Sequence, residues 1–116
     1  MAHFRKKDTL TSDHTFQLAS VSKTITAIAT LQLIEKGKLK LTDTVKQFLP
    51  RFPYNGIDIH QLLSHRSGMS QYTHFCDRPD SIWPDKRKTI TINDVLDIME
   101  RIIPMRNYPP NKRYYY

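Results

Sequence analysis

Apolar residues are spread around most of one predicted helix, from about residue 20 to residue 36. They form no single stripe, and threonines supply most of the polar positions between them. The apolar positions are Val21, Ile25, Ile28, Ala29, Leu31, Leu33 and Ile34. Lys36 and then Gly37 predict the end of the helix, because glycine readily takes the left-handed conformation that closes a helix. We expect such a helix to be buried on most of its sides.

A second helix, predicted over residues 91–103, has the opposite pattern. Its apolar positions, 95, 96, 99, 102 and 103, form one stripe that would face a core. Thr91 is the predicted N-cap, and Asp94 follows it at the spacing of a capping box. A similar segment starts at Asp58 and predicts a short helix that ends by Ser67 and Gly68. Both segments are therefore expected to begin with side-chain caps.

The rest of the chain is punctuated by turn-forming residues. Residues 1–16 are polar and predict a leading loop. Thr42 and Asp43 are predicted to cap a short helix that Pro50 ends. Residues 70–89 form a long, proline- and charge-rich loop, in which Phe75 and Trp83 are expected to act as anchors. A length of 116 residues and the absence of a repeat allow one domain at most.

The net charge of +7 raises the question of nucleic acid binding. The densest basic groups, Arg5-Lys6-Lys7 and Lys86-Arg87-Lys88, lie beside turn-like residues and not on a periodic helix face. Solvated loops explain such groups more simply than a phosphate-binding surface does. We therefore expect no nucleic acid partner, although binding to nucleic acid stays open as a minor alternative.

The cysteine count and the apolar runs narrow the classes further. Cys76 is the only cysteine, so the chain forms no internal disulfide, and its five histidines are dispersed. We expect neither a metal nor another cofactor. No stretch reaches the roughly 18 apolar residues of a membrane span, and the first residues lack a signal-peptide core. The chain as written is expected to stay in the cytoplasm.

Ser20 and Lys23 are the first candidate for chemistry. A spacing of three residues at a helix start turns the chain by about 300° and raises it by roughly 4.5 Å, so the two side chains can meet. A serine hydroxyl becomes a good nucleophile when a nearby base takes its proton, and a lysine serves as that base when burial lowers its pKa. The simpler alternative is an N-cap serine next to a solvated lysine.

Two motifs in order give this pair a context. Phe16-Gln17-Leu18-Ala19-Ser20-Val21-Ser22-Lys23-Thr24 precedes the apolar helix, and Leu62-Leu63-Ser64-His65-Arg66-Ser67-Gly68-Met69 follows downstream. Together they resemble the nucleophile region and the "LLTHTSGL" segment of class C β-lactamases and D-alanyl-D-alanine carboxypeptidases, which are related to penicillin-binding proteins. The resemblance runs from about Phe16 to Tyr116. It implies that Ser20 is acylated and that Lys23 assists proton transfer.

The resemblance also suggests a role for the last residue of the sequence. Pro110-Asn111-Lys112-Arg113-Tyr114-Tyr115-Tyr116 is similar to the lead-in of the family's Tyr-x-Asn element, which makes Tyr116 the proton-handling tyrosine. A frayed aromatic tail is the equally open alternative. For His65, a loop histidine that hydrogen-bonds the backbone is the preferred interpretation over a base. Ser64 and Ser67 are expected to serve as turn and cap residues.

The implied fold is mainly α with short strands, the helical part of the α+β β-lactamase/transpeptidase-like fold, incomplete at both ends. Residues 17–116 would supply the nucleophile helix and the helical region. The family's Lys-Thr-Gly strand is absent, and losing one oxyanion donor costs about a hundred- to a thousandfold in turnover. The resemblance therefore implies a serine acyl-transfer hydrolase fragment that is inactive alone.

Several questions stay open at this point. β-Lactams, D-alanyl peptides and small esters are all possible substrates, and the parents of such a fragment usually work in the periplasm or cell envelope. The alternative function is a non-enzymatic helical interaction module. In either case the apolar helix would expose its surface or pair with a second copy.

Overall fold

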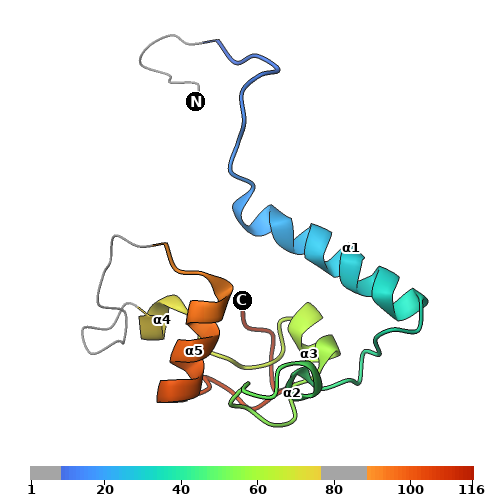
Figure 1. Ribbon diagram of the computed structural model, residues 1–116, viewed down its shortest axis with the longest axis vertical. Coiled ribbons are helices and arrows are strands. Elements are labelled where there is room, and N and C mark those ends of the chain that lie inside the picture. Colours follow the sequence, from blue (N-terminus) through green and yellow to red (C-terminus); the bar gives the residue numbers. More distant parts are fainter. Residues whose placement is uncertain (1–8, 77–88) are drawn as a thin grey trace.

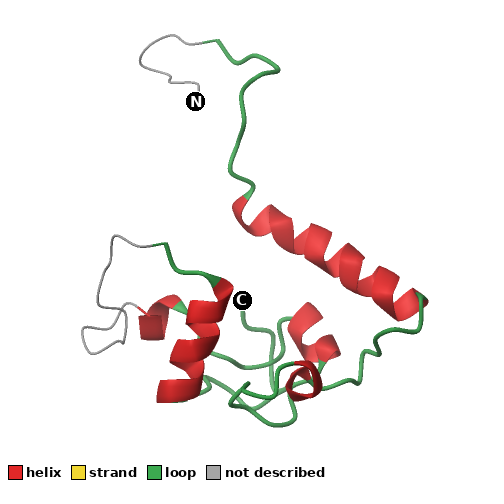
Figure 2. Cartoon of the chain, viewed as in Figure 1, coloured by secondary structure: helices red, strands yellow, loops and turns green. Residues whose placement is uncertain are grey.

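The computed structural model describes residues 9–76 and 89–116 (Figure 1). The basic groups Arg5–Lys7 and Lys86–Lys88, together with Trp83, lie outside these ranges. In chain order the elements are η2 (Ala19–Val21), α1 (Ser22–Glu35), α2 (Val45–Phe48), α3 (Ile59–Leu63), α4 (Thr73–Cys76) and α5 (Ile92–Ile102). Figure 2 shows helices joined by irregular segments.

The described residues confirm a mainly helical chain but contain less β-structure than expected. Instead of short strands, these two ranges hold one isolated antiparallel bridge, between Thr44 and Asp58. Residues 9–18 form an irregular segment that leads away from α1, as predicted for the leading loop (Figure 1). A sheet needs paired segments, and within the described ranges this one bridge is the only such pairing.

A small core gathers side chains from α2, α4, α5 and the loop between α2 and α3. Its buried members are Val45, Phe52, Tyr54, Ile57, Phe75, Cys76, Ile98 and Met99. Phe75 is buried in this core as expected for an anchor, but the prediction of a continuous loop from residue 70 is wrong, because α4 begins at Thr73. The Tyr54 hydroxyl donates a hydrogen bond to the Pro104 carbonyl, which ties the segment after α5 to the same core.

Helix α1 lies to one side of that core and contributes no buried residue (Figure 1). Its exposed large apolar residues are Ile25, Ile28, Leu31 and Leu33. Thr26 and Thr30 donate their hydroxyl hydrogen bonds to carbonyls of α1 itself, at 3.2 and 2.8 Å. The prediction that this helix is buried on most sides is wrong for this chain, and the expectation that it exposes its apolar surface is confirmed, because the core does not extend to its apolar faces. The predicted end is correct, since Gly37 has φ +65°.

Helix α5 packs on the core, although its buried face is shifted from the predicted stripe. Met99 is buried as expected, but Ile98, which the stripe left out, is more deeply buried, at 3% exposure. Ile102 and Ile103 are exposed, because the helix ends here and Ile103 turns into the left-handed region. Thr91 and Asp94 form the predicted capping box.

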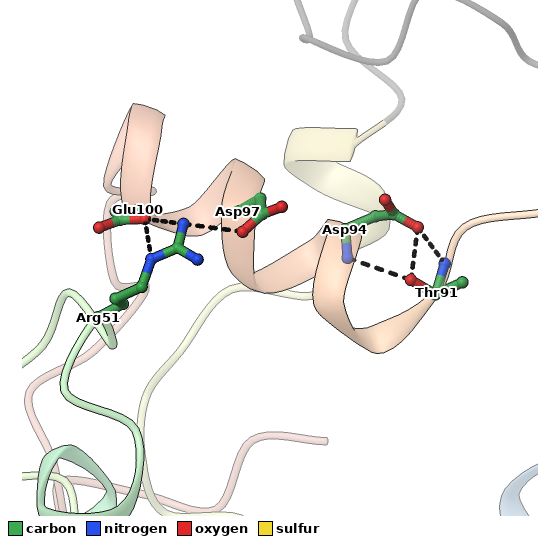
Figure 3. A network of polar contacts seen from close by, with 5 residues as sticks. All are labelled: Arg51, Thr91, Asp94, Asp97 and Glu100. Atoms are coloured by element: carbon green, nitrogen blue, oxygen red, sulfur yellow. Dashed lines mark hydrogen bonds and ion pairs between the residues drawn. The ribbon is translucent and has the colours of Figure 1, made fainter.

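Figure 3 shows that Arg51 forms ion pairs with two acidic side chains of α5. Arg51 donates to Glu100 through Nε at 2.6 Å, and its Nη2 lies 2.8 Å from an Asp97 carboxylate oxygen. The hydrogen bond from Arg51 lowers the pKa of Glu100 below its ordinary value, against a smaller opposing effect of desolvation. This ion pair therefore links α5 to the segment that follows α2.

The caps of the two short helices explain how the middle of the chain turns. Asp58 caps α3 as predicted, and its side chain accepts from the Gln61 N–H at 2.7 Å. For α2 the prediction of Thr42 and Asp43 is wrong, because Thr44 forms the capping box with Gln47. Asp43 instead accepts from the Lys40 N–H at 2.8 Å and closes the preceding turn.

Candidate active site

Ser20 lies in the 3₁₀ turn η2, directly before α1, and Lys23 lies in the first turn of that helix. The Lys23 ammonium donates a hydrogen bond to the Ser20 hydroxyl oxygen at 3.2 Å. Ala19 has a left-handed φ of +46°, and the Ser22 hydroxyl donates to the Ala19 carbonyl, so the backbone turns sharply just before Ser20. The structure therefore brings together the serine and the amine that the sequence paired.

Tyr116 lies beside Ser20 and Lys23, although it is distant from them in the sequence. Its phenol interacts with Ser20 and with Lys23. The Lys23 nitrogen also lies 5.3 Å from the centre of the Tyr116 ring. The hydrogen bond with Ser20, together with the hydrogen bond and the positive charge of Lys23, lowers the pKa of the Tyr116 phenol below its ordinary value. Burial of Tyr116 opposes this effect only in part.

Solvent reaches all three side chains. Ser20, Lys23 and Tyr116 are exposed. The apolar helix therefore does not bury Lys23 in this chain, because α1 itself is uncovered. What distinguishes the site is the mutual contact of one hydroxyl, one ammonium and one phenol.

The segment 65–68 positions the tail that carries Tyr116. The Gly68 carbonyl accepts from the N–H groups of residues 107 and 108, at 2.9 and 3.3 Å. The Arg66 carbonyl accepts from Asn111 at 2.8 Å, and the His65 carbonyl accepts from Tyr115 at 2.8 Å. Successive carbonyls therefore hold successive parts of the tail, and the last of these bonds lies one residue before Tyr116.

Gly68 allows the closest of these approaches. It has φ +70°, and a Cβ added there would lie 2.0 Å from the Tyr108 carbonyl oxygen. No side chain fits at that distance, so glycine is required for both the backbone conformation and the space. Gly68 was predicted to end a helix, and its contact with the tail was not predicted.

His65 contacts the tail through its ring as well as through its backbone. The ring packs edge-to-face on Tyr116, with centroids 4.9 Å apart, and on Tyr114, at 5.7 Å. Its neighbours have the expected local roles: the Ser64 hydroxyl donates to the His60 carbonyl at 2.7 Å, and the Ser67 hydroxyl accepts from the Met69 N–H at 3.4 Å.

A pocket of about 460 Å³ opens beside the Ser20 hydroxyl. Its wall is formed by Ser20 and Lys23, by the segment from the end of α3 to the start of α4, and by the tail. The lining residues are Ser20, Lys23, Leu62, His65, Ser67, Met69, Ser70, Gln71, Tyr72, Thr73, Tyr115 and Tyr116. Gln71 also donates to the Tyr116 backbone oxygen at 3.2 Å, a contact that no pattern in the sequence predicts. The pocket has the volume of a small-molecule site.

A second cavity, of about 350 Å³, separates α1 from α3 and shares Lys23, Leu62 and His65 with the first. Its other walls are mostly apolar. In the described ranges, no three side chains of the metal-binding types gather in one place, and no helix has the length and apolarity to cross a bilayer.

A serine, a lysine that donates to it and a tyrosine meet at one pocket. The sequence matches the family model described as Beta-lactamase over residues 1–116. The chain therefore belongs to the β-lactamase family, and its mainly helical structure is consistent with a part of that family's fold.

Curated relatives agree with this assignment. The chain is 34% identical to a penicillin-binding protein of Bacillus subtilis strain 168, over 115 residues that make up 99% of the chain and 25% of that protein. It is 40% identical to esterase EstB of Burkholderia gladioli over 67 residues, 52% of the chain and 17% of that protein. Penicillin-binding protein 4 of Amycolatopsis lactamdurans is 37% identical over 67 residues, 53% of the chain and 18% of that protein.

These relatives show the serine hydrolase family but are much longer than the chain. Even the Bacillus protein is covered over only a quarter of its length. The chain therefore corresponds in length to about a quarter of that relative.

Proposed function

We propose that this chain provides the nucleophile side of a serine acyl-transfer hydrolase that acts on β-lactams or D-alanyl peptides. The observation that carries the proposal is the contact of Ser20 with both Lys23 and Tyr116 at the edge of a pocket. The names of the penicillin-binding relatives support β-lactams as substrates, and the relative named as an esterase supports carbonyl chemistry in general.

The proposed first step follows from the hydrogen bonds. Lys23 donates to the Ser20 oxygen and Ser20 lowers the pKa of the Tyr116 phenol, so we assign the Ser20 proton to Tyr116. The Tyr116 phenolate takes that proton while the Ser20 oxygen attacks the carbonyl carbon. The carbon–nitrogen bond of the substrate then breaks, and Tyr116 returns the proton to the leaving nitrogen. Water hydrolyses the resulting acyl ester and frees Ser20.

The lowered pKa of Tyr116 predicts a pH dependence with a definite sign. The phenolate is the base, so the acylation rate should rise with pH as Tyr116 loses its proton. Because Ser20 and Lys23 lower this pKa, the rise should start below the ordinary phenol value of about 10. In a Tyr116→Phe variant the rise should disappear, and acylation should fall by about 10²–10⁴-fold.

We also propose that the 116-residue chain alone has negligible turnover. No Lys-Thr-Gly sequence occurs in it, and it corresponds to a quarter of the Bacillus relative. Electrostatic stabilisation of the oxyanion is commonly the largest contribution to acyl transfer, and it needs donors on both sides of the carbonyl oxygen. Activity is therefore expected only when the remaining part is supplied.

A chimera tests the assignment of Ser20. This chain would replace the aligned quarter of the Bacillus relative, and the product would be incubated with a fluorescent penicillin. We expect labelling of the chimera, loss of label in Ser20→Ala, and retention in Ser22→Ala, whose hydroxyl bonds only the Ala19 carbonyl among the described contacts. Label that survives Ser20→Ala would refute the nucleophile. Label on the unmodified 116-residue chain would refute its proposed inactivity.

A second candidate function rests on a different observation, the uncovered apolar surface of α1. Two copies of the chain could bury these surfaces against each other, which would make it a self-associating helical module. Sedimentation at rising concentration should then show a dimer that Ile28→Glu abolishes. Ile92→Glu is the control, because it makes the same exchange at an exposed isoleucine of α5. A monomer at all concentrations would exclude this function.

A further inference from the structure

His65 is the residue that contacts the tail in two independent ways. Its carbonyl accepts the Tyr115 N–H at 2.8 Å, which fixes the backbone immediately before Tyr116. Its ring packs edge-to-face on the ring of Tyr116 at 4.9 Å and of Tyr114 at 5.7 Å. These contacts restrain both the backbone and the ring plane of the last tyrosine.

The backbone of His65 makes the double contact possible. It has φ +54°, in the left-handed region, which histidine and asparagine adopt more readily than most residues. This residue follows directly after Ser64, the C-cap of α3, so the chain reverses there. The reversal turns the carbonyl to the tail while the ring reaches the same tail from one side. A residue in a helical conformation would not present both groups in this way.

Ser20 and Lys23 also interact with Tyr116. The Lys23 ammonium lies 5.3 Å from the ring centre, and Ser20 interacts with the phenol. Neither Ser20 nor Lys23 is close in sequence to the tail, and α1 lies apart from the core (Figure 1). His65 is therefore the described contact that connects the Tyr116 ring to the core side of the molecule.

We propose that His65 is a positioning residue, whose ring holds the Tyr116 phenol against Ser20 and Lys23. The ring acts by contact and takes no proton in the reaction. This inference rests on the proposed function, since it concerns the placement of the tyrosine that receives the Ser20 proton. Edge-to-face pairs of this type typically contribute about 0.5–1.5 kcal/mol, enough to change the fraction of correctly placed phenol by about two- to tenfold.

The test distinguishes the contribution of the His65 ring from that of the His65 backbone. His65→Asn keeps a residue that tolerates the left-handed conformation but removes the aromatic ring. His65→Phe keeps an aromatic ring without the imidazole nitrogens. His60→Asn is the matched control, because it makes the same exchange at an exposed histidine of α3. Each change is made in the 116-residue chain, and each variant is also made with Tyr116→Phe.

The first readout is the ultraviolet titration of Tyr116, obtained by subtracting the curve of the corresponding Tyr116→Phe protein. In the unchanged chain the titration midpoint should lie below about 10. We expect His65→Asn to raise it toward that value, and His65→Phe and His60→Asn to leave it low. A low midpoint in His65→Asn would overturn the inference, because the phenol would then be placed without the ring.

The second readout is the nuclear Overhauser effect between the rings of residues 65 and 116. It should be present in the unchanged chain, and its absence would overturn the inference whatever the titration shows. If the effect is present but the unchanged chain titrates at the ordinary value, the proton route of the proposed function fails. Contact between the rings would then support placement by His65 without support for acyl transfer. The two failures are therefore distinguishable.

Discussion

Helices α1 and α5 differ in how their apolar residues are used. Helix α1 has the larger apolar content, yet none of its residues is buried in the described structure. Helix α5 has charged residues on one side, and it buries Ile98 and Met99 in the core. A one-sided pattern lets a small core cover the apolar face of a helix, whereas a helix that is apolar all round needs partners on several sides. This chain therefore covers the apolar face of α5 but leaves the apolar surface of α1 exposed.

Polar contacts reinforce the difference. Helix α5 begins at the Thr91–Asp94 capping box and is bound from outside by Arg51 (Figure 3). The hydroxyls of Thr26 and Thr30 bond within α1. The contact that reaches α1 from the core side involves Lys23 and the tail residue Tyr116. In the described chain the candidate site therefore lies where an uncovered helix meets a packed region.

The largest expected effect is on folding stability, and it tests the difference in burial between α5 and α1. Ile98→Ala should destabilise the chain by about 2–5 kcal/mol, because it leaves a cavity in the core. Ile28→Ala, at an isoleucine that is 54% exposed, should change the free energy of unfolding by less than about 0.5 kcal/mol. Urea denaturation monitored by circular dichroism measures both. Equal losses would mean that α1 is covered in solution.

A smaller effect is expected at the contact between the core and the tail. Gly68→Ala places a Cβ against the Tyr108 carbonyl and also strains a left-handed residue. The left-handed conformation alone costs roughly 1–2 kcal/mol, and the steric clash adds to it. Gly37→Ala is the matched control, because Gly37 has φ +65° but no atom within 4 Å of an added Cβ.

Urea denaturation of the two glycine variants measures this difference directly. Gly68→Ala should lose more stability than Gly37→Ala, and it should also raise the titration midpoint of Tyr116 by releasing the tail. If the two substitutions are equally costly, the approach of Tyr108 to Gly68 does not matter for stability. That result would remove the proposed support of the tail.

The smallest effect concerns the ion pair that α5 makes and α1 lacks in the described ranges. Arg51 lowers the pKa of Glu100, so this pair stabilises the fold above the carboxyl's ordinary value of 4.5. The stabilisation is lost as the pH falls through the lowered folded-state value. Both groups are exposed, so solvent screens the pair and the change should be small. In Glu100→Gln this part of the acid dependence of thermal unfolding should disappear.

Local features of the chain were predictable wherever neighbours in sequence decide the structure. Asp58 and Thr91 cap their helices as the spacing predicted, and Gly37 ends α1. Capping depends on hydrogen bonds within one turn, so the pattern contains all the partners. At α2 the same reasoning selected Thr42 and Asp43, one or two residues before the true cap Thr44, because all three can accept such a bond.

The candidate site was predictable in part for the same reason. Ser20 and Lys23 lie within one turn, so their contact follows from helix geometry. Tyr116 was included because the tail resembles a family element, and its distance from Ser20 in the chain gave no geometric support. The tail contacts of Gly68 and Arg66 were not predicted, since backbone bonds between distant segments leave no periodic signal in a sequence.

Local order in the sequence determined α1, α3 and α5, the caps at Asp58 and Thr91, the pairing of a serine with a lysine and the family to which the chain belongs. The tertiary structure decided which apolar faces are covered, and it brought Tyr116 to the serine. Burial depends on how many elements are available to surround a helix, and a distant contact depends on the path of the chain between its partners. Neither quantity is contained in the local order of residues.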